Sequence, residues 1–211
     1  MSILLLRLSA PLQSWGSDSR FDTRQTNREP TKSGVIGMIA AALGISREDS
    51  AEKLAALNKL NFAVRVDKEG NLLRDYHTVK SAKSSYITNR YYLADAAFLV
   101  GMESDDKQLL KRIGKALHNP VFSLFLGRRS CPPTLPIDLG LRDGTLESVL
   151  KNEPLLCETG EPIRYIFETT ENGILINDVS VSFSQKHRRY NYRMYKEVIE
   201  KRMEHDPMSE L

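Results

Sequence analysis

The side chains best suited to chemistry lie near the carboxyl end of this 211-residue sequence, where cations are interleaved with aromatic rings. The segment from Ser184 to Arg193 reads SQKHRRYNYR. This mixture is typical of single-stranded nucleic-acid binding, because Lys and Arg pair with phosphates while Tyr rings stack on bases. A candidate RNA site is therefore centred on Arg188, Arg189 and Tyr190, with Lys186 beside them. A solvated strand edge is the alternative interpretation.

The charge is unevenly distributed along the chain. The formal net charge is +3, but the segment from Lys186 to Arg202 holds seven Lys or Arg and two Glu, a charge of +5, which leaves −2 for the remainder. Local potential matters more than total charge for holding a polyanion, so one basic face is expected. A solvated C-terminal helix would carry the same charge.

Two further groups of polar and basic residues come early in the chain. Arg20 and Arg24 stand four residues apart in the stretch 13–30, which has no apolar periodicity and is expected to form a long loop. Lys32 and Ser33 follow at the expected start of a helix, where backbone N–H groups and an ammonium suit a phosphate oxygen. Ordinary helix capping is the alternative. The TKSG sequence lacks the glycines of a nucleotide-binding phosphate loop, which argues against nucleotide hydrolysis.

The segment from Leu72 to Arg90 is too long for a tight connection and predicts a protruding β-hairpin. It combines tyrosines with the basic residues His77, Lys80, Lys83 and Arg90. The tyrosines either contact nucleotides or pack across the strands.

A pair of arginines, Arg128 and Arg129, follows Gly127. Adjacent guanidinium groups can chelate phosphates through several N–H donors. Paired arginines at a strand end serve equally well as partners of carboxylates.

Patterns for catalysis and metal binding are sparse. The four histidines show no metal-ligand spacing, and no G-x-S-x-G elbow occurs. Cys131 and Cys157 suit neither a disulfide framework nor a zinc site, so both are expected to be reduced and structural. We expect a non-catalytic protein with no cofactor and no metal. Neither a signal sequence nor a membrane-length apolar run is found, so a cytoplasmic protein without membrane contact is expected.

The order of the expected elements predicts the fold class. Apolar runs and cap residues indicate strands at 2–8, 62–67, 91–101 and 121–126, and helices at 31–43, 46–60 and 104–119. This order predicts an α+β, ferredoxin-like (RNA-recognition-type) domain over residues 1–126, with the hairpin inserted in it. Strands near 163–167 and 174–183 predict a smaller β-rich C-terminal region over 127–211 with a basic tail.

Five short segments resemble, in the same order, the Cas-five group of CRISPR proteins, as found in the type I-E Cascade complex. They read LSAPLQSWG at 8–16, PTKSG at 30–34, DYHTV at 75–79, YLADA at 92–96 and LGRRSCP at 126–132. The resemblance spans most of the chain. This sequence departs from the group in a compact hairpin, with 11 residues between Val79 and Tyr91, and in its basic C-terminal end.

The resemblance implies a ferredoxin-like domain whose protruding thumb hairpin caps the backbone filament and which holds the 5′ handle of the guide RNA. It places RNA contacts at Lys32, Ser33, His77, Lys80 and Lys83, with the two arginines after Gly127 near the handle. The implied partners are guide RNA, a neighbouring Cascade backbone subunit and the large target-sensing subunit. Target DNA would be read indirectly, through base pairing with the guide.

Two residues in the resembling segments are expected to lie outside the site. Trp15 and Tyr92 alternate with apolar neighbours, which predicts that both pack in the core.

Two rival functions stay open. Tyr76, His77 and Lys80 offer the acid, base and charge that a metal-independent endoribonuclease needs to process precursor guide RNA. A free-standing RNA-recognition module is the other, although the paired aromatic strand motifs of such a module are not found.

Overall fold

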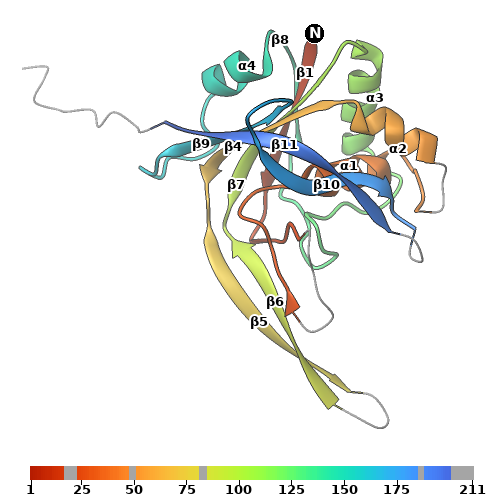
Figure 1. Cartoon of the computed structure of the whole chain (residues 1–211), viewed down its shortest axis with the longest axis vertical. Coiled ribbons are helices and arrows are strands. Elements are labelled where there is room, and N and C mark those ends of the chain that lie inside the picture. Colours follow the sequence, from red (N-terminus) through yellow and green to blue (C-terminus); the bar gives the residue numbers. More distant parts are fainter. Residues whose placement is uncertain (17–22, 48–50, 81–84, 185–187, 201–211) are drawn as a thin grey trace, which may run out of the picture.

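The computed structural model describes residues 1–16, 23–47, 51–80, 85–184 and 188–200. In these ranges four helices accompany a seven-stranded antiparallel sheet of order β10-β11-β9-β4-β7-β1-β8 and a smaller sheet in which β6 pairs with β2, β3 and β5 (Figure 1). The predicted α+β class is confirmed. The strands are β1 (Ser2–Ser9), β2 (Leu12–Gln13), β3 (Thr23–Arg24), β4 (Asn61–Lys68), β5 (Asn71–Lys80), β6 (Ser85–Ala94), β7 (Ala97–Ser104), β8 (Asp138–Asp143), β9 (Ile163–Thr169), β10 (Ile174–Ser182) and β11 (Arg189–Glu200), and the helices are α1 (Lys32–Ala42), α2 (Ala51–Asn58), α3 (Lys107–His118) and α4 (Leu146–Asn152).

The central strands are apolar on both faces because both faces are covered. In β1, Leu4 and Leu6 belong to the large hydrophobic cluster shared with α1, α2 and α3. Ile3 and Leu5 belong to a second cluster that includes α4. Successive side chains of a strand point to opposite faces, so a sheet with two covers needs a nearly continuous apolar run.

Helix α1 begins and ends where its sequence signals it. The Thr31 hydroxyl accepts a hydrogen bond from the Gly34 amide at 3.2 Å, which caps the first turn. Gly44, with φ of 75°, turns the chain away after the last turn. For the second predicted helix, 46–60, the structure has α2 at Ala51–Asn58, and the described residues 46, 47, 59 and 60 are not helical.

Two strand predictions were wrong. Residues 121–126 form no strand, because the amides of Val121 and Phe122 donate to the carbonyls of Ala42 and Ala41 and so satisfy the end of α1. The strand expected at 91–101 is two strands, β6 and β7, which are separated at Asp95 by a positive φ of 57°. The next strand after α3 is β8, which pairs with β1.

Strands β5 and β6 pair from Asn71 opposite Ala94 to Lys80 opposite Ser85, so the predicted antiparallel hairpin is present. Figure 1 shows that it projects far from the main sheet. Large apolar side chains stay exposed on it, including Leu72 at 65% and Tyr76 at 62%.

The main sheet continues across residue 127, where the sequence suggested a boundary between two regions. Strand β9 pairs with β4, and β11 and β10 extend the same sheet. Within the described ranges, no helix is long and apolar enough to cross a membrane.

A buried ion pair fastens the segment after α4 to strand β4. Arg65 and Asp67 are almost fully buried and form two hydrogen bonds of 2.6 and 2.9 Å. Arg65 also donates to the carbonyl of Pro154 at 2.8 Å, and the Leu156 amide donates to Asp67 at 2.7 Å. A chain segment without regular structure is thus fixed by one guanidinium and one carboxylate.

Replacing Asp67 by alanine is expected to destabilise the protein by about 3–5 kcal/mol, because the buried Arg65 loses its counter-charge. Urea unfolding checks this. Glu147→Ala, which removes an exposed partner of Lys151 on α4, is the control and should change stability little. Equal midpoints for the two variants would show that the buried pair does not stabilise the fold.

Candidate nucleic-acid interface

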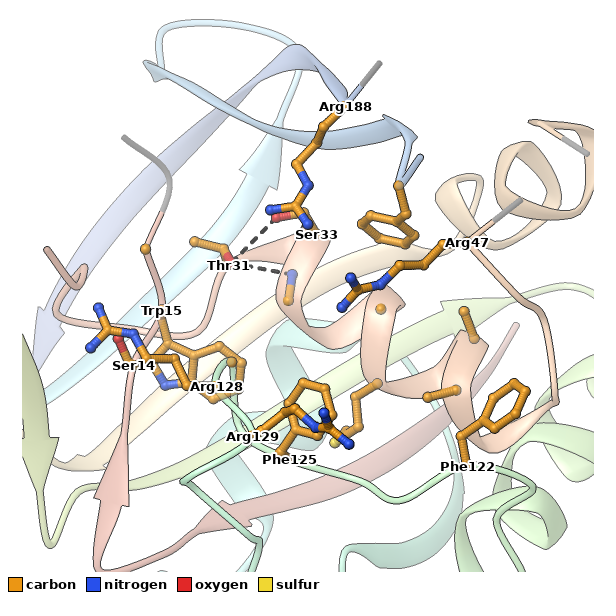
Figure 2. Close-up of a pocket in the computed structure, with 18 of the residues that line it drawn as sticks. Ser14, Trp15, Thr31, Ser33, Arg47, Phe122, Phe125, Arg128, Arg129 and Arg188 are labelled. Atoms are coloured by element: carbon orange, nitrogen blue, oxygen red, sulfur yellow. Dashed lines mark hydrogen bonds between the residues drawn. The ribbon is translucent and has the colours of Figure 1, made fainter. Parts of the chain in front are cut away.

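A cleft of about 910 Å³ runs along α1 and is bordered by segments from both halves of the chain. Five arginines line it, and none of its described lining residues is acidic. Figure 2 shows four of them, Arg47, Arg128, Arg129 and Arg188, which come from three separate segments of the chain. The arginines are Arg24, Arg47, Arg128, Arg129 and Arg188.

The floor of the cleft is built around the buried Trp15. Its indole Nε1 donates to Gln13 Oε1 at 3.1 Å and its amide donates to Thr26 Oγ1 at 2.8 Å. Gly34 lies against the ring, because a Cβ there would come within 2.9 Å of Trp15 Cε3. The prediction that Trp15 and Tyr92 pack in the core is confirmed, since their exposed fractions are 1% and 3%.

Arg128 is held in place by protein groups. Its guanidinium carbon lies 4.7 Å from the centre of the Tyr92 ring, and Nη2 donates to the carbonyl of Arg24 at 2.8 Å. The preceding Gly127 has φ of 86°, and any Cβ would lie 1.7 Å from the carbonyl oxygen of Ser14. Glycine is therefore required for the two arginines to follow this turn, after which Arg129 is exposed at the cleft.

Cys131 lies at the back of the same turn, where its amide donates to the Arg128 carbonyl at 2.9 Å. Burial raises the pKa of its thiol. A raised pKa keeps the thiol protonated at neutral pH, which agrees with a structural role.

Lys32 faces into the protein rather than the cleft. Its side chain is 4% exposed, and its ammonium pairs with Glu168 at 2.9 and 3.0 Å. Its amide donates to Asp178 Oδ2 at 2.8 Å, and Arg193 Nε donates to Asp178 Oδ1 at 2.7 Å. We therefore leave Lys32 out of the candidate site and regard it as an anchor of α1.

Other predicted residues divide between the cleft and more distant surfaces. Ser33 lines the cleft at the start of α1, and Arg188 and Tyr190 line it from the start of β11. Arg189 is exposed but is not part of the lining. Arg20, Lys83 and Lys186 lie outside the described residues.

The hairpin residues form a separate group. His77 Nε2 lies 2.6 Å from Asp75 Oδ2 and Lys80 is exposed near the described end of β5. Arg90 stands beside Arg24, where β3 and β6 pair in parallel. None of His77, Lys80 and Arg90 lines the cleft.

Several lining residues were not predicted from the sequence. Arg47 follows α1, while Phe122 and Phe125 belong to the segment expected to be a strand, and Phe183 comes from the end of β10. The positions of Phe122 and Phe125 depend on the loop that caps the carbonyls of α1. The sequence pattern holds no signal for that contact.

This fold and cleft define a class of α+β proteins with a cationic groove suited to a polyanion. A family model described as "CRISPR-associated protein (Cas_Cas5)" matches residues 3–196. The chain therefore belongs to the Cas5 family of CRISPR-associated proteins.

Individual relatives agree with this assignment. The Escherichia coli (strain K12) protein "CRISPR system Cascade subunit CasD" is 39% identical over 158 residues, which cover 66% of this chain and 70% of the relative. A structure described as "Crystal structure of Cas protein" is 39% identical with a TM-score of 0.76, covering 94% of this chain and 95% of that one. A chain of a "CRISPR RNA-guided surveillance complex" is 34% identical with a TM-score of 0.79, covering 94% and 90%.

Gly127→Ala is expected to destabilise the protein by roughly 2–4 kcal/mol, because the new methyl group collides with the Ser14 carbonyl in addition to straining the backbone. Gly160→Ala is a matched control, since Gly160 also has a positive φ, of 71°, but nothing within 4 Å of the added Cβ. Trp15 is the one tryptophan of the sequence, so its fluorescence reports on the cleft during thermal unfolding. Similar losses in both variants would mean that the contact with Ser14 is unimportant.

Proposed function

We propose that this chain is a subunit of a CRISPR Cascade complex and that its cleft binds the 5′ handle of the guide RNA. The observation that carries the proposal is the convergence of five arginines, with no acidic residue among the described lining. A surface of this kind attracts phosphates, because no carboxylate in the described lining offsets the positive charge of the guanidinium groups. Similarity to the named Cascade subunit and to the surveillance-complex chain supports the assignment.

The proposed mechanism is binding without bond cleavage. Exposed Arg47, Arg129 and Arg188 neutralise phosphates, while Arg128 is fixed beneath them by Tyr92. The hydroxyl and amide of Ser33 lie at the positive end of α1, where an RNA phosphate is favoured. Aromatic side chains along the cleft offer surfaces for unstacked bases, which is how single-stranded RNA is usually recognised.

The arrangement of strands supports the finer description of the fold. Strands β4, β7, β1 and β8 lie in the order of a ferredoxin-like sheet, with α1 and α3 in the connections. The β5–β6 hairpin is inserted between β4 and β7, as a thumb would be. Residues 127–211 would then form a C-terminal region that extends this sheet.

The hairpin is the proposed contact with neighbouring subunits. Leu72, Tyr76 and Ile87 are exposed at 65%, 62% and 49% on its two strands. An exposed apolar ribbon of this kind is typical of a protein interface. We assign it to the adjacent backbone subunit and the surrounding surface to the large target-sensing subunit, with His77 and Lys80 near the RNA.

Removing three cleft charges tests the RNA site. The triple variant Arg47→Ala, Arg129→Ala, Arg188→Ala is expected to bind handle RNA roughly a hundredfold more weakly, at about 1 kcal/mol for each lost contact. The slope of log affinity against log salt should fall by about 2, since each phosphate contact on single-stranded RNA contributes about 0.7. Fluorescence anisotropy with a labelled handle RNA measures both.

The control removes the same charge elsewhere. Lys111, Arg112 and Lys115 are exposed on α3, away from the cleft lining, so their triple alanine variant should keep nearly the full affinity. Equal losses in both variants would indicate nonspecific attraction and contradict a site in the cleft.

A second function is kept because of one contact. The His77–Asp75 pair at 2.6 Å has the geometry of a carboxylate-oriented imidazole, which a metal-independent endoribonuclease could use as a general base.

Incubation of purified protein with repeat-derived RNA in EDTA distinguishes the two functions. We expect binding with the RNA left intact, because the cleft and not the hairpin collects the phosphate-binding groups. A single defined cut by the wild type that is lost in His77→Ala would establish the nuclease instead. In the first case Lys80→Ala should weaken binding only slightly, because Lys80 lies outside the cleft lining, and in the second case it should slow cleavage.

A further inference from the structure

The two ends of the cleft differ in chemistry. One end, at the start of α1, carries Thr31 and Ser33 with Arg188 across from them (Figure 2). The other end, where α1 finishes, carries Phe122, whereas Phe125 lies beside Arg129 (Figure 2). The helix has 11 residues, so these ends are about 16 Å apart.

Small residues on one side of α1 connect the two ends. Ser33, Gly37 and Ala41 are spaced by four, and Gly34 lies beside them, so the lining of this side has almost no side-chain bulk. Protein rings occupy part of this side, because Trp15 lies against Gly34 and Phe183 lies against Gly37. The Phe183 ring lies against the middle of α1, since a Cβ on Gly37 would meet the ring at 3.4 Å.

The far end presents exposed apolar surface at a fixed position. Phe122 is 47% exposed, and its amide is held by the Ala41 carbonyl at 3.2 Å. Met38 and Ile45 complete the lining beside Ala41. The surface is therefore available to a flat apolar group.

The described lining holds no Asn, Gln, Asp, Glu, Lys or His. These side chains, together with Arg, are the usual readers of base edges. An apolar end without them is suited to the face of a base, which is contacted by stacking rather than by hydrogen bonds.

We infer that the apolar end formed by Met38, Ala41, Ile45 and Phe122 is a subsite for one unstacked base of the bound RNA, with Arg47 and Arg129 on the adjoining phosphates. The inference rests on the proposed function. The occupant follows from charge, because the apolar end adjoins a cleft whose described charged lining residues are all arginines. A base joined to a phosphate satisfies both surfaces at once.

A steric experiment tests this subsite. Handle RNAs carrying a single abasic nucleotide at each position in turn are compared with intact RNA by anisotropy. For the wild type, one position should cost about tenfold in affinity, the usual scale for one stacked base. Ala41→Leu fills the subsite without changing charge, so it should weaken intact RNA about tenfold. It should have no effect on RNA that is abasic at that same position.

Two further variants make the result specific. Ala55→Leu, on the exposed side of α2, introduces the same side chain outside the cleft and should bind every RNA as the wild type does. Phe122→Ala should also lose the dependence on that one base. Thermal unfolding confirms that each variant is folded.

The outcomes separate this inference from the function on which it rests. If the wild type binds handle RNA but no abasic position matters, or if the effects of Ala41→Leu and of every abasic position simply add, the subsite is overturned and handle binding stands. If the wild type binds no handle RNA, the proposed function fails and the subsite fails with it. If Ala41→Leu binds a partner protein more weakly but binds RNA as the wild type does, the apolar end is assigned to a protein side chain.

Discussion

The first turn of α1 is fixed to the sheet by four buried or partly buried charges, and the rest of the cleft depends on this attachment. Lys32 pairs with Glu168 of β9, and the Lys32 amide shares the carboxylate of Asp178 with Arg193 of β11. The two cations and two anions cancel, so the network adds no net charge beneath the cleft. Removing one member would leave a buried charge without its partner, which is far more costly than losing a surface pair. Because this network joins α1 to β9, β10 and β11, it sets the distance between α1 and the lining residues that flank β10 and β11.

Local signals predicted the elements that depend on local chemistry. Thr31 and Gly44 define α1 because a cap and a left-handed turn are properties of a few neighbouring residues. The apolar run of β1 likewise reflects burial that the strand carries in its own sequence, whereas in β4 the polar Arg65 and Asp67 are buried as well. Residues 121–126 were mistaken for a strand because their backbone groups are satisfied by the end of α1, a contact between segments about 80 residues apart. Such a contact overrides strand propensity and leaves no pattern in the sequence.

The candidate site was partly predictable for a related reason. Arginines and a tyrosine were chosen for their chemistry, and the fold brings Arg24, Arg128, Arg129, Arg188 and Tyr190 to one cleft. Charge type alone does not reveal whether a cation has a partner, and so Lys32, whose ammonium faces Glu168, was included. Apolar lining residues such as Phe122 could not be distinguished from core residues, because only the tertiary arrangement leaves part of the ring exposed.

The contact between Arg128 and Tyr92 has a mechanical consequence. Tyr92 belongs to β6, the strand that continues into the hairpin, whereas Arg128 belongs to the cleft. The Tyr92 ring is thus shared by the hairpin and the cleft, so a change in the angle of the hairpin would move the Arg128 guanidinium that packs on the ring. Thermodynamic linkage makes such an effect reciprocal. If a contact to the hairpin raises the affinity of the cleft for its ligand, the ligand raises the affinity of the hairpin for that contact by the same factor.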